Sequence, residues 1–235
     1  MQGMSKMQFH SFGDAQILNS ILAEQIKEIL EKAVNQRGQA YLVVSGGKTP
    51  VDLFGILAKK KLPWDKVTIT VADERCVGAD DIDRNELLVK HFLLQHEAKG
   101  AKFLSLYDEH THPADSLKKT AGVIASLPIF DAVILGMGED GHTASLFPCS
   151  NELAQGLDDN SEAVLYVTPQ TALHQRVSLS KKRLLDSRII FLHLVGQKKR
   201  SVFNQALAEG NPMFMPVSAI LNNQNTNVQV MYAPS

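Results

Sequence analysis

The sequence contains few cysteines, no long apolar run and no excess of charge of either sign. Its two cysteines, Cys76 and Cys149, are too few and too far apart for a disulfide framework or a zinc knuckle. The 24 basic and 25 acidic residues nearly cancel, so composition gives no electrostatic reason to expect a nucleic acid or an anionic membrane as partner. Overall charge therefore does not indicate a polyanion as partner, and a local basic patch is compatible with these numbers.

Two further absences bear on location and organisation. No apolar stretch approaches the roughly 20 residues that a bilayer requires, and residues 1–16 lack the apolar centre of a signal peptide. No low-complexity linker, repeat or long charge run divides the 235 residues, of which 44% are hydrophobic. We therefore expect a cytoplasmic protein with one domain over residues 1–235. The sequence does not reveal the oligomeric state; a monomer is the default, because no amphipathic surface helix requires a partner.

What the chain does contain is an alternation of apolar strands and helical patterns. The clearest helix runs from Asp14 to Arg37, where apolar residues recur at helical spacing and Gly38 supplies a stop. The alternation predicts an α/β fold with a mostly parallel, doubly wound (Rossmann-like) sheet and helices on both faces. The other helices are expected at 49–61, 83–98, 114–127, 181–186 and 197–210, and the strands at 40–44, 67–72, 102–106, 131–136, 163–167, 176–180, 188–195 and 228–232.

Two of these helices have recognisable starts. The helix at 49–61 has Thr49 as a cap and Pro50 in its first position, and the helix at 83–98 has Asp83 and Glu86 in capping-box spacing. In open parallel sheets ligands bind beyond the carboxyl ends of the strands. The loops that follow strands are therefore where a functional site is expected.

The first such loop is SGGKT at 45–49. It ends like a Walker A motif, but that motif needs a glycine at position 42, which is leucine, so a P-loop NTPase is not expected. Its glycines still let backbone N–H groups approach a phosphate at the start of a helix, and Ser45, Lys48 and Thr49 add hydroxyls and charge. A tight turn with an exposed lysine is the alternative.

The second loop is GMGEDG at 136–141, after the strand at 131–136. Its glycines fit a dinucleotide fingerprint, but Pro148 interrupts the long helix that the fingerprint requires. Glu139, Asp140 and His142 offer different chemistry, because a histidine beside a carboxylate at a strand end is typical of a general base that activates water. An exposed or structural loop histidine is the alternative.

The third loop is ADERCV at 72–77. Asp73, Glu74 and Arg75 form a surface ion pair in one interpretation. In the other, Arg75 points into the same crevice as the first two loops and grips phosphate oxygens in bidentate fashion. Three polar loops at one edge of one sheet favour a shared site over three independent turns.

These loops resemble signature segments of the glucosamine-6-phosphate isomerase/6-phosphogluconolactonase family. The matching segments are SGGKTP, DERCV and, most specifically, GMGEDGHTASLFP, followed by QRVSLS with Arg176 and LVGQKKR with Lys199. The lactonase branch fits better, since Arg75 stands where the deaminases typically carry tyrosine, and HTASLFP lacks the glutamate of their chemistry. Gly78 and Arg84 depart from the usual proline and from the serine of a Ser-Asn pair, which leaves the substrate contacts around Arg84 open.

The resemblance implies hydrolysis of 6-phosphoglucono-1,5-lactone to 6-phosphogluconate in the oxidative pentose phosphate pathway, with no metal and no organic cofactor. His142 is then the general base and Asp140 orients it or stabilises its cation. The substrate and its phosphate are assigned to Ser45, Gly46, Gly47, Lys48, Thr49, Asp73, Arg75, Arg176 and Lys199.

Three rival functions are consistent with parts of the sequence. A sugar-phosphate isomerase or deaminase shares the fold and the phosphate loop, a dinucleotide-dependent oxidoreductase uses GMGEDG, and a sensor binds a sugar phosphate without catalysis. A metal at Glu109, His110 and His112 is not expected, because no distant third ligand has convincing spacing. His91, His96, His174 and His193 carry no spacing signal.

Overall fold

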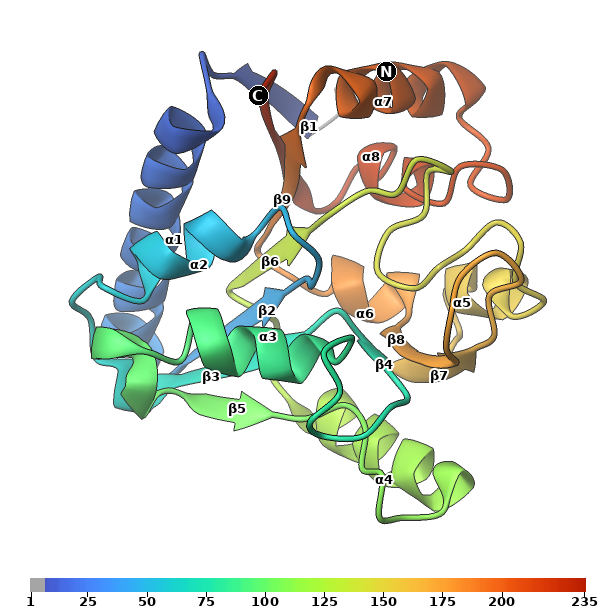
Figure 1. The fold of residues 1–235 in the computed structure, drawn as a ribbon, viewed down its shortest axis with the longest axis horizontal. Coiled ribbons are helices and arrows are strands. Elements are labelled where there is room, and N and C mark those ends of the chain that lie inside the picture. Colours follow the sequence, from blue (N-terminus) through green and yellow to red (C-terminus); the bar gives the residue numbers. More distant parts are fainter. Residues whose placement is uncertain (1–6) are drawn as a thin grey trace.

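A computed structural model describes residues 7–235, and residues 1–6 of the expected single domain lie outside the described part. In the described chain, seven parallel strands form a central sheet in the order β1-β10-β9-β6-β2-β3-β5 (Figure 1). This confirms the predicted α/β class and the mostly parallel, Rossmann-like sheet. The strands are β1 (Met7–Ser11), β2 (Ala40–Val44), β3 (Val67–Val71), β5 (Lys102–Leu104), β6 (Ala132–Leu135), β9 (Ile189–Val195) and β10 (Asn227–Ala233).

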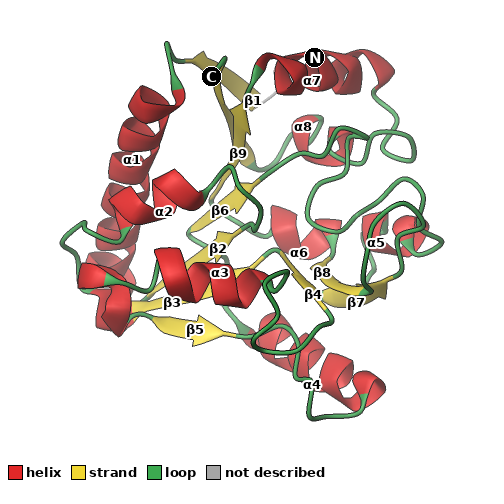
Figure 2. Ribbon diagram, in the orientation of Figure 1, coloured by secondary structure: helices red, strands yellow, loops and turns green. Residues whose placement is uncertain are grey.

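Helices flank both faces of this sheet, as predicted. One group of helices lies on one face and a second group, later in the chain, lies on the other (Figures 1 and 2). The first group is α1 (Ala15–Arg37), α2 (Val51–Leu57) and α3 (Asn85–Phe92), with the short 3₁₀ helices η1 (Trp64–Lys66) and η2 (His96–Gly100). The second group is α4 (Pro113–Ser126), α5 (Leu153–Leu157), α6 (Lys181–Leu185), α7 (Gln197–Glu209) and α8 (Ser218–Leu221). No helix within residues 7–235 is long and apolar enough to cross a bilayer.

Three strands form a second, antiparallel sheet in the order β4-β8-β7. These are β4 (Asp73–Arg75), β7 (Val164–Val167) and β8 (Arg176–Leu179). The sequence predicts β7 and β8 as strands but does not separate them from the main sheet, because the apolar pattern of a strand does not specify its partner. The sequence also misses β1 and β4, because both are short and neither contains a continuous apolar run.

The helix starts show which capping predictions hold. Asp14 caps α1 by accepting a hydrogen bond from the backbone N–H of Ile17 at 2.8 Å, and Gly38 ends the helix with φ of 77°, in the left-handed region. The cap expected at Thr49 is wrong, since α2 begins after Pro50 with no side-chain cap. Pro50 therefore stands just outside the helix and not in its first position.

The capping box expected from Asp83 and Glu86 is also wrong. The carboxylate of Glu74, on β4, accepts the backbone N–H groups of Asn85 and Glu86 at the start of α3, both at 2.7 Å. A cap from a distant strand leaves no trace in local spacing. It ties the start of α3 directly to the second sheet.

The order of strands creates an opening between β2 and β6. These strands are neighbours, but the chain leaves β2 towards β3 and leaves β6 towards β9. The loops after the two strands therefore diverge, and a crevice forms at their carboxyl ends. Buried apolar side chains fill the sheet interior on both faces, which makes this edge a rigid platform for the loops.

Candidate active site

A cavity of about 300 Å³ lies at this crevice. Apart from Asp140, every predicted site residue lines it: Ser45, Gly46, Gly47, Lys48, Thr49, Asp73, Arg75, His142, Arg176 and Lys199. Asp140 lies behind His142 and contacts its ring. The structure thus brings the three loops to one place, beside the ends of β8 and β9.

The glycine loop after β2 packs closely on the start of α3. A Cβ at Gly46 would overlap the side-chain amide of Asn85, so any larger residue there would displace that amide. Gly47 has φ of 87°, in the left-handed region. The hydroxyl of Ser45 donates to the carbonyl of Ile134 at 2.9 Å and so joins the loop to β6. Because the hydroxyl of Ser45 is engaged, the loop brings its glycine backbone and the exposed Lys48 to the cavity wall.

The loop after β6 folds Asp140 against His142. Nδ1 of His142 lies 2.6 Å from Oδ1 of Asp140, and the same oxygen accepts the backbone N–H of His142 at 3.1 Å. Burial acts to raise the pKa of Asp140, but the hydrogen bonds and charge of His142 outweigh it, so the pKa lies below its usual range. An ionised carboxylate only accepts hydrogen bonds, so Nδ1 carries the proton and Nε2 keeps a free lone pair. Nε2 is thereby fit to act as a general base.

A glycine of the GMGEDG segment, Gly138, makes space for the His142–Asp140 pair. At Gly138 a Cβ would fall 2.1 Å from Nδ1 of His142 and 2.6 Å from Oδ1 of Asp140. The backbone N–H of Gly138 also donates to the carbonyl of His142 at 2.8 Å. Turns follow β6, and no long helix does, so the helix that a dinucleotide fingerprint needs is absent between Gly136 and Glu152. Gly138 makes room for an imidazole.

Arg75 and Arg176 stand directly opposite each other on the antiparallel pair β4 and β8. Directly opposed side chains on neighbouring strands lie close together, and like charges in this position are unfavourable. Burial lowers the pKa of Arg176, and the charge of Arg75 lowers it further. Two arginines that are paired in register and line the same cavity bring two positive charges to its wall, which attracts an anion.

Asp73 and Lys199 line the cavity but are engaged within the protein. Oδ2 of Asp73 accepts from the hydroxyl of Ser145 at 2.5 Å, and Nη1 of Arg176 lies 3.9 Å from the same oxygen. Nζ of Lys199 donates to the carbonyl of Met137 at 2.6 Å. Asp73 therefore links β4 to the loop that carries His142, while Lys199 brings a positive charge from α7 to the same cavity.

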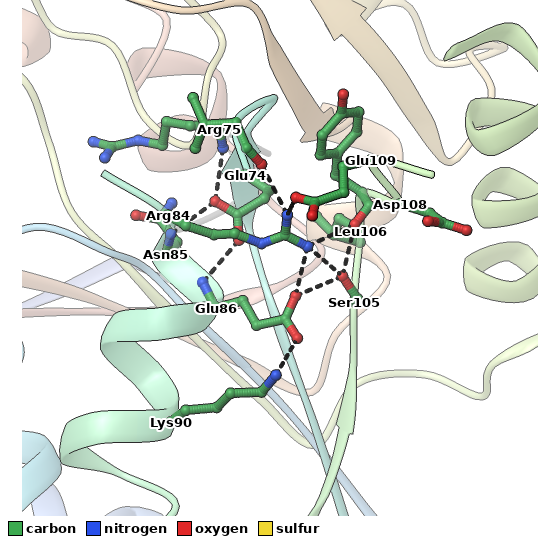
Figure 3. A network of polar contacts seen from close by, with 12 residues as sticks. Glu74, Arg75, Arg84, Asn85, Glu86, Lys90, Ser105, Leu106, Asp108 and Glu109 are labelled. Atoms are coloured by element: carbon green, nitrogen blue, oxygen red, sulfur yellow. Dashed lines mark hydrogen bonds and ion pairs between the residues drawn. The ribbon is translucent and has the colours of Figure 1, made fainter. Parts of the chain in front are cut away.

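Arg84, where the sequence departs from the family pattern, is not among the residues that line the cavity, and its side chain lies between Glu86 and Glu109 (Figure 3). Its guanidinium donates to Oε2 of Glu86 at 3.0 Å, to Oε2 of Glu109 at 3.4 Å and to the carbonyls of Val77 and Tyr107. Arg84 therefore holds together the loops on either side of it. The structure assigns it a local structural role and no contact with the cavity.

The neighbouring Glu74 is fully buried and completes this support (Figure 3). Besides capping α3, its carboxylate accepts the backbone N–H of Arg75 at 2.7 Å. Burial raises the pKa of Glu74 to about 7, against the opposing effect of its backbone donors. The middle residue of the DER segment thus positions Arg75 and Asn85, and does not form the surface ion pair considered from the sequence.

Among the cavity residues that the sequence did not predict are Asn85 and His193. Asn85 donates from Nδ2 to the carbonyl of Asp73 at 2.8 Å and lines the cavity beside Gly46. His193, on β9, is 3% exposed, and neither ring nitrogen has a hydrogen-bond partner in the described structure. Burial lowers the pKa of His193 to about 4, so the ring is neutral near pH 7. A single polar residue in the apolar run FLHLV was the available signal for His193.

The segment with Glu109, His110 and His112 lies outside the cavity. Glu109 binds Arg84, and the side chain of His110 is exposed. Within residues 7–235 no group of three or more His, Cys, Asp or Glu side chains is arranged to hold a metal ion. The segment around these residues forms a solvated loop ahead of α4.

Comparison with known proteins defines the class. Residues 13–230 match the family model described as glucosamine-6-phosphate isomerases/6-phosphogluconolactonase. The chain therefore belongs to this family of sugar-phosphate enzymes, as the motifs predict.

Several relatives that match over nearly the whole chain are named 6-phosphogluconolactonase. The chain is 39% identical to a 6-phosphogluconolactonase of Mesorhizobium japonicum, over 96% of this chain and 95% of that protein. It is 35% identical to one of Neisseria meningitidis, over 96% and 98% of the two chains. A crystal structure of a 6-phosphogluconolactonase from Shewanella baltica superposes with a TM-score of 0.93, at 43% identity and 97% coverage of both chains.

Proposed function

We propose that the protein hydrolyses 6-phosphoglucono-1,5-lactone to 6-phosphogluconate, in the oxidative pentose phosphate pathway. One observation carries the proposal: His142, paired with Asp140, lines the same cavity as two opposed arginines, Arg75 and Arg176. The pair supplies a base for water, and the arginines supply a site for the phosphate. The names of the relatives point to the same substrate.

The geometry supports a simple sequence of proton transfers. Nε2 of His142 takes a proton from water as the water oxygen attacks the lactone carbonyl carbon. The tetrahedral intermediate then breaks its bond to the ring oxygen, and His142 returns the proton to that oxygen. Water is consumed, the ester bond opens, and His142 ends neutral. Asp140 holds the ring orientation throughout and stabilises the imidazolium that forms between the two steps.

Phosphate binding at a distance contributes to the rate. The phosphate group does not react, but its contacts with Arg75, Arg176, Lys199 and the backbone of 45–49 hold the carbonyl carbon in reach of the attacking water. Such contacts turn a bimolecular encounter into an oriented one and lower the barrier through remote binding energy. The assignment of these residues to the phosphate is part of the proposal.

The test is the loss of freshly generated lactone, followed by a coupled dehydrogenase or by proton release, with spontaneous hydrolysis subtracted. The wild type should accelerate ring opening, His142→Ala should lose about 10²-fold or more of kcat, and Arg75→Ala should chiefly raise KM. A wild-type rate no faster than buffer contradicts the proposal. A rate unaffected by His142→Ala retains the function and rejects the mechanism.

The deaminase alternative has no support in the site. The segment after His142, residues 143–148, is TASLFP and contains no carboxylate. Release of ammonia from glucosamine 6-phosphate by the pure protein would support that alternative. The expected cytoplasmic location and monomeric state remain predictions.

A further inference from the structure

Two loops beside the cavity are joined by a pair of side chains outside the residues assigned to the site. The first loop, residues 76–84, leads from β4 to α3, and the second, residues 168–175, joins β7 to β8. Nε2 of His174 lies 2.9 Å from Oδ2 of Asp83 and links them. The hydrogen bond from His174, more than any other interaction, holds the pKa of Asp83 below its usual value. An ionised Asp83 can only accept, so Nε2 of His174 is the donor.

The backbones of the same two residues hold the arginines. Nη1 of Arg75 donates to the carbonyl of Asp83 at 2.5 Å. Nε of Arg176 donates to the carbonyls of His174 at 3.3 Å and Leu173 at 3.2 Å, and its Nη2 donates to Leu173 at 2.9 Å. Arg75 and Arg176 are themselves opposed across β4 and β8. The four residues form a closed ring of contacts.

The backbone conformation of His174 indicates that this closed set of four contacting residues constrains the loop. His174 has φ of 67°, in the left-handed region, which is uncommon for residues other than glycine. Such conformations persist where the surroundings impose them, and they cluster at sites of function. The side chains of His174 and Asp83 are 30% and 49% exposed, so their pairing adds little to stability. We therefore expect the pair to affect the positions of Arg75 and Arg176, which the two loops hold.

We propose that the His174–Asp83 pair is a latch that holds the guanidinium groups of Arg75 and Arg176 together to bind the phosphate of the substrate. The latch counteracts the repulsion between two like charges that the strand pairing places side by side. The identity of the anion rests on the proposed function. His174 and Asp83 act through the arginines and are positioning residues.

The test uses inorganic phosphate and 6-phosphogluconate as probes, with their Kd measured by calorimetry on the full chain. His174→Gly removes the imidazole and also relieves the left-handed backbone, so its melting temperature should stay equal or rise. The latch predicts that Kd for both probes nevertheless rises about tenfold, with the same rise in KM and with kcat within roughly twofold. Asp83→Asn should behave alike, and His174→Gln, which keeps a donor, should recover part of the affinity.

The matched control is His96→Gly. His96 also has a positive φ, of 50°, but it lies exposed in η2 and does not line the cavity. Its substitution relieves the same type of strain and should leave Kd and KM unchanged. Equal affinity in wild type, His174→Gly and Asp83→Asn overturns the latch. So does a wild type that binds neither probe, whereas a wild type that binds phosphate but does not open the lactone overturns the proposed function alone.

Discussion

Oδ1 of Asp140 accepts two hydrogen bonds from one residue, His142: one from the ring Nδ1 and one from the backbone N–H. The backbone bond fixes where the loop turns, and the ring bond fixes which nitrogen carries the proton. Together they leave the Nε2 lone pair available without any further group. The ring also packs on Phe147, with centroids 4.2 Å apart, which restricts its rotation.

Asp140→Asn is expected to lower kcat by about 10²-fold or more, because an amide can donate to Nδ1 and so favour the tautomer with Nε2 protonated. The fold should survive, since Asn keeps an oxygen for the backbone N–H of His142. Background-corrected lactone hydrolysis and a thermal melt check both parts. An Asn variant with wild-type kcat would show that Asp140 does not set the tautomer.

Gly138→Ala is expected to abolish most activity while the protein remains folded. The new Cβ would occupy the space of the His142 ring, so the imidazole and Asp140 must both move. A displacement near 1 Å in a reacting group costs about 10²-fold in rate. Kinetics and circular dichroism on the same preparation measure the effect.

The control for this substitution is Gly122→Ala, in the exposed part of α4 with open space around the added Cβ. It should raise the free energy of unfolding by about 0.5–1 kcal/mol, because glycine is a poor helix former, and should leave kcat unchanged. Equal activity in both variants contradicts the close contact at Gly138.

Arg75→Gln should separate stability from binding. Without a ligand, removing one of two opposed like charges is expected to leave the free energy of unfolding equal or higher by about 0.2–1 kcal/mol. With 6-phosphogluconate the order should reverse, because a ligand at about 100 times Kd adds about 2.7 kcal/mol to the wild type and less to a weaker binder. Urea unfolding with and without the ligand measures both terms. A variant less stable than wild type without ligand contradicts the repulsion.

His193 predicts a loss of stability in acid. Burial lowers its folded pKa to about 4, while an exposed histidine titrates near 6.5, so between these values the unfolded chain binds more protons. This contribution to stability is complete above pH 6.5 and is lost as the pH falls to 4, amounting to about 3 kcal/mol.

Urea unfolding of wild type and His193→Leu at several pH values between 7 and 4 isolates this loss. The difference between the two free energies of unfolding removes the contribution of the other histidines. The wild type should lose stability relative to the variant as the pH falls. Parallel curves would mean that His193 is hydrogen-bonded or solvated in the folded protein.

The sequence predicts those parts of the site whose residues all lie in one loop directly after a strand. The segments 45–49 and 136–142 each follow a buried strand directly, so their position at the sheet edge follows from the strand pattern alone. The interaction of Asp140 with His142 is likewise local, two residues apart.

The parts that the sequence does not predict depend on partners distant in the chain. The three residues of β4 form a strand because β8 pairs with them, and α3 begins at Asn85 because Glu74 caps it. Asn85 reaches the cavity for the same reason. His193 is recognisable only once β9 is known to end at the cavity. Long-range pairing, and not local propensity, decides each of these positions.

The strand order described above has a consequence for which molecules fit. His142 lies in the loop after β6, and the glycine loop follows the neighbouring strand β2. The opposed Arg75 and Arg176 belong to β4 and β8, which follow β3 and β7 in the chain. Neighbouring strands are about 4.8 Å apart, and the buried sheet does not stretch. The sheet therefore fixes the distance between the base and the arginines. It favours molecules whose anionic group stands a set number of bonds from the carbon that water attacks, and discriminates by length against shorter ones.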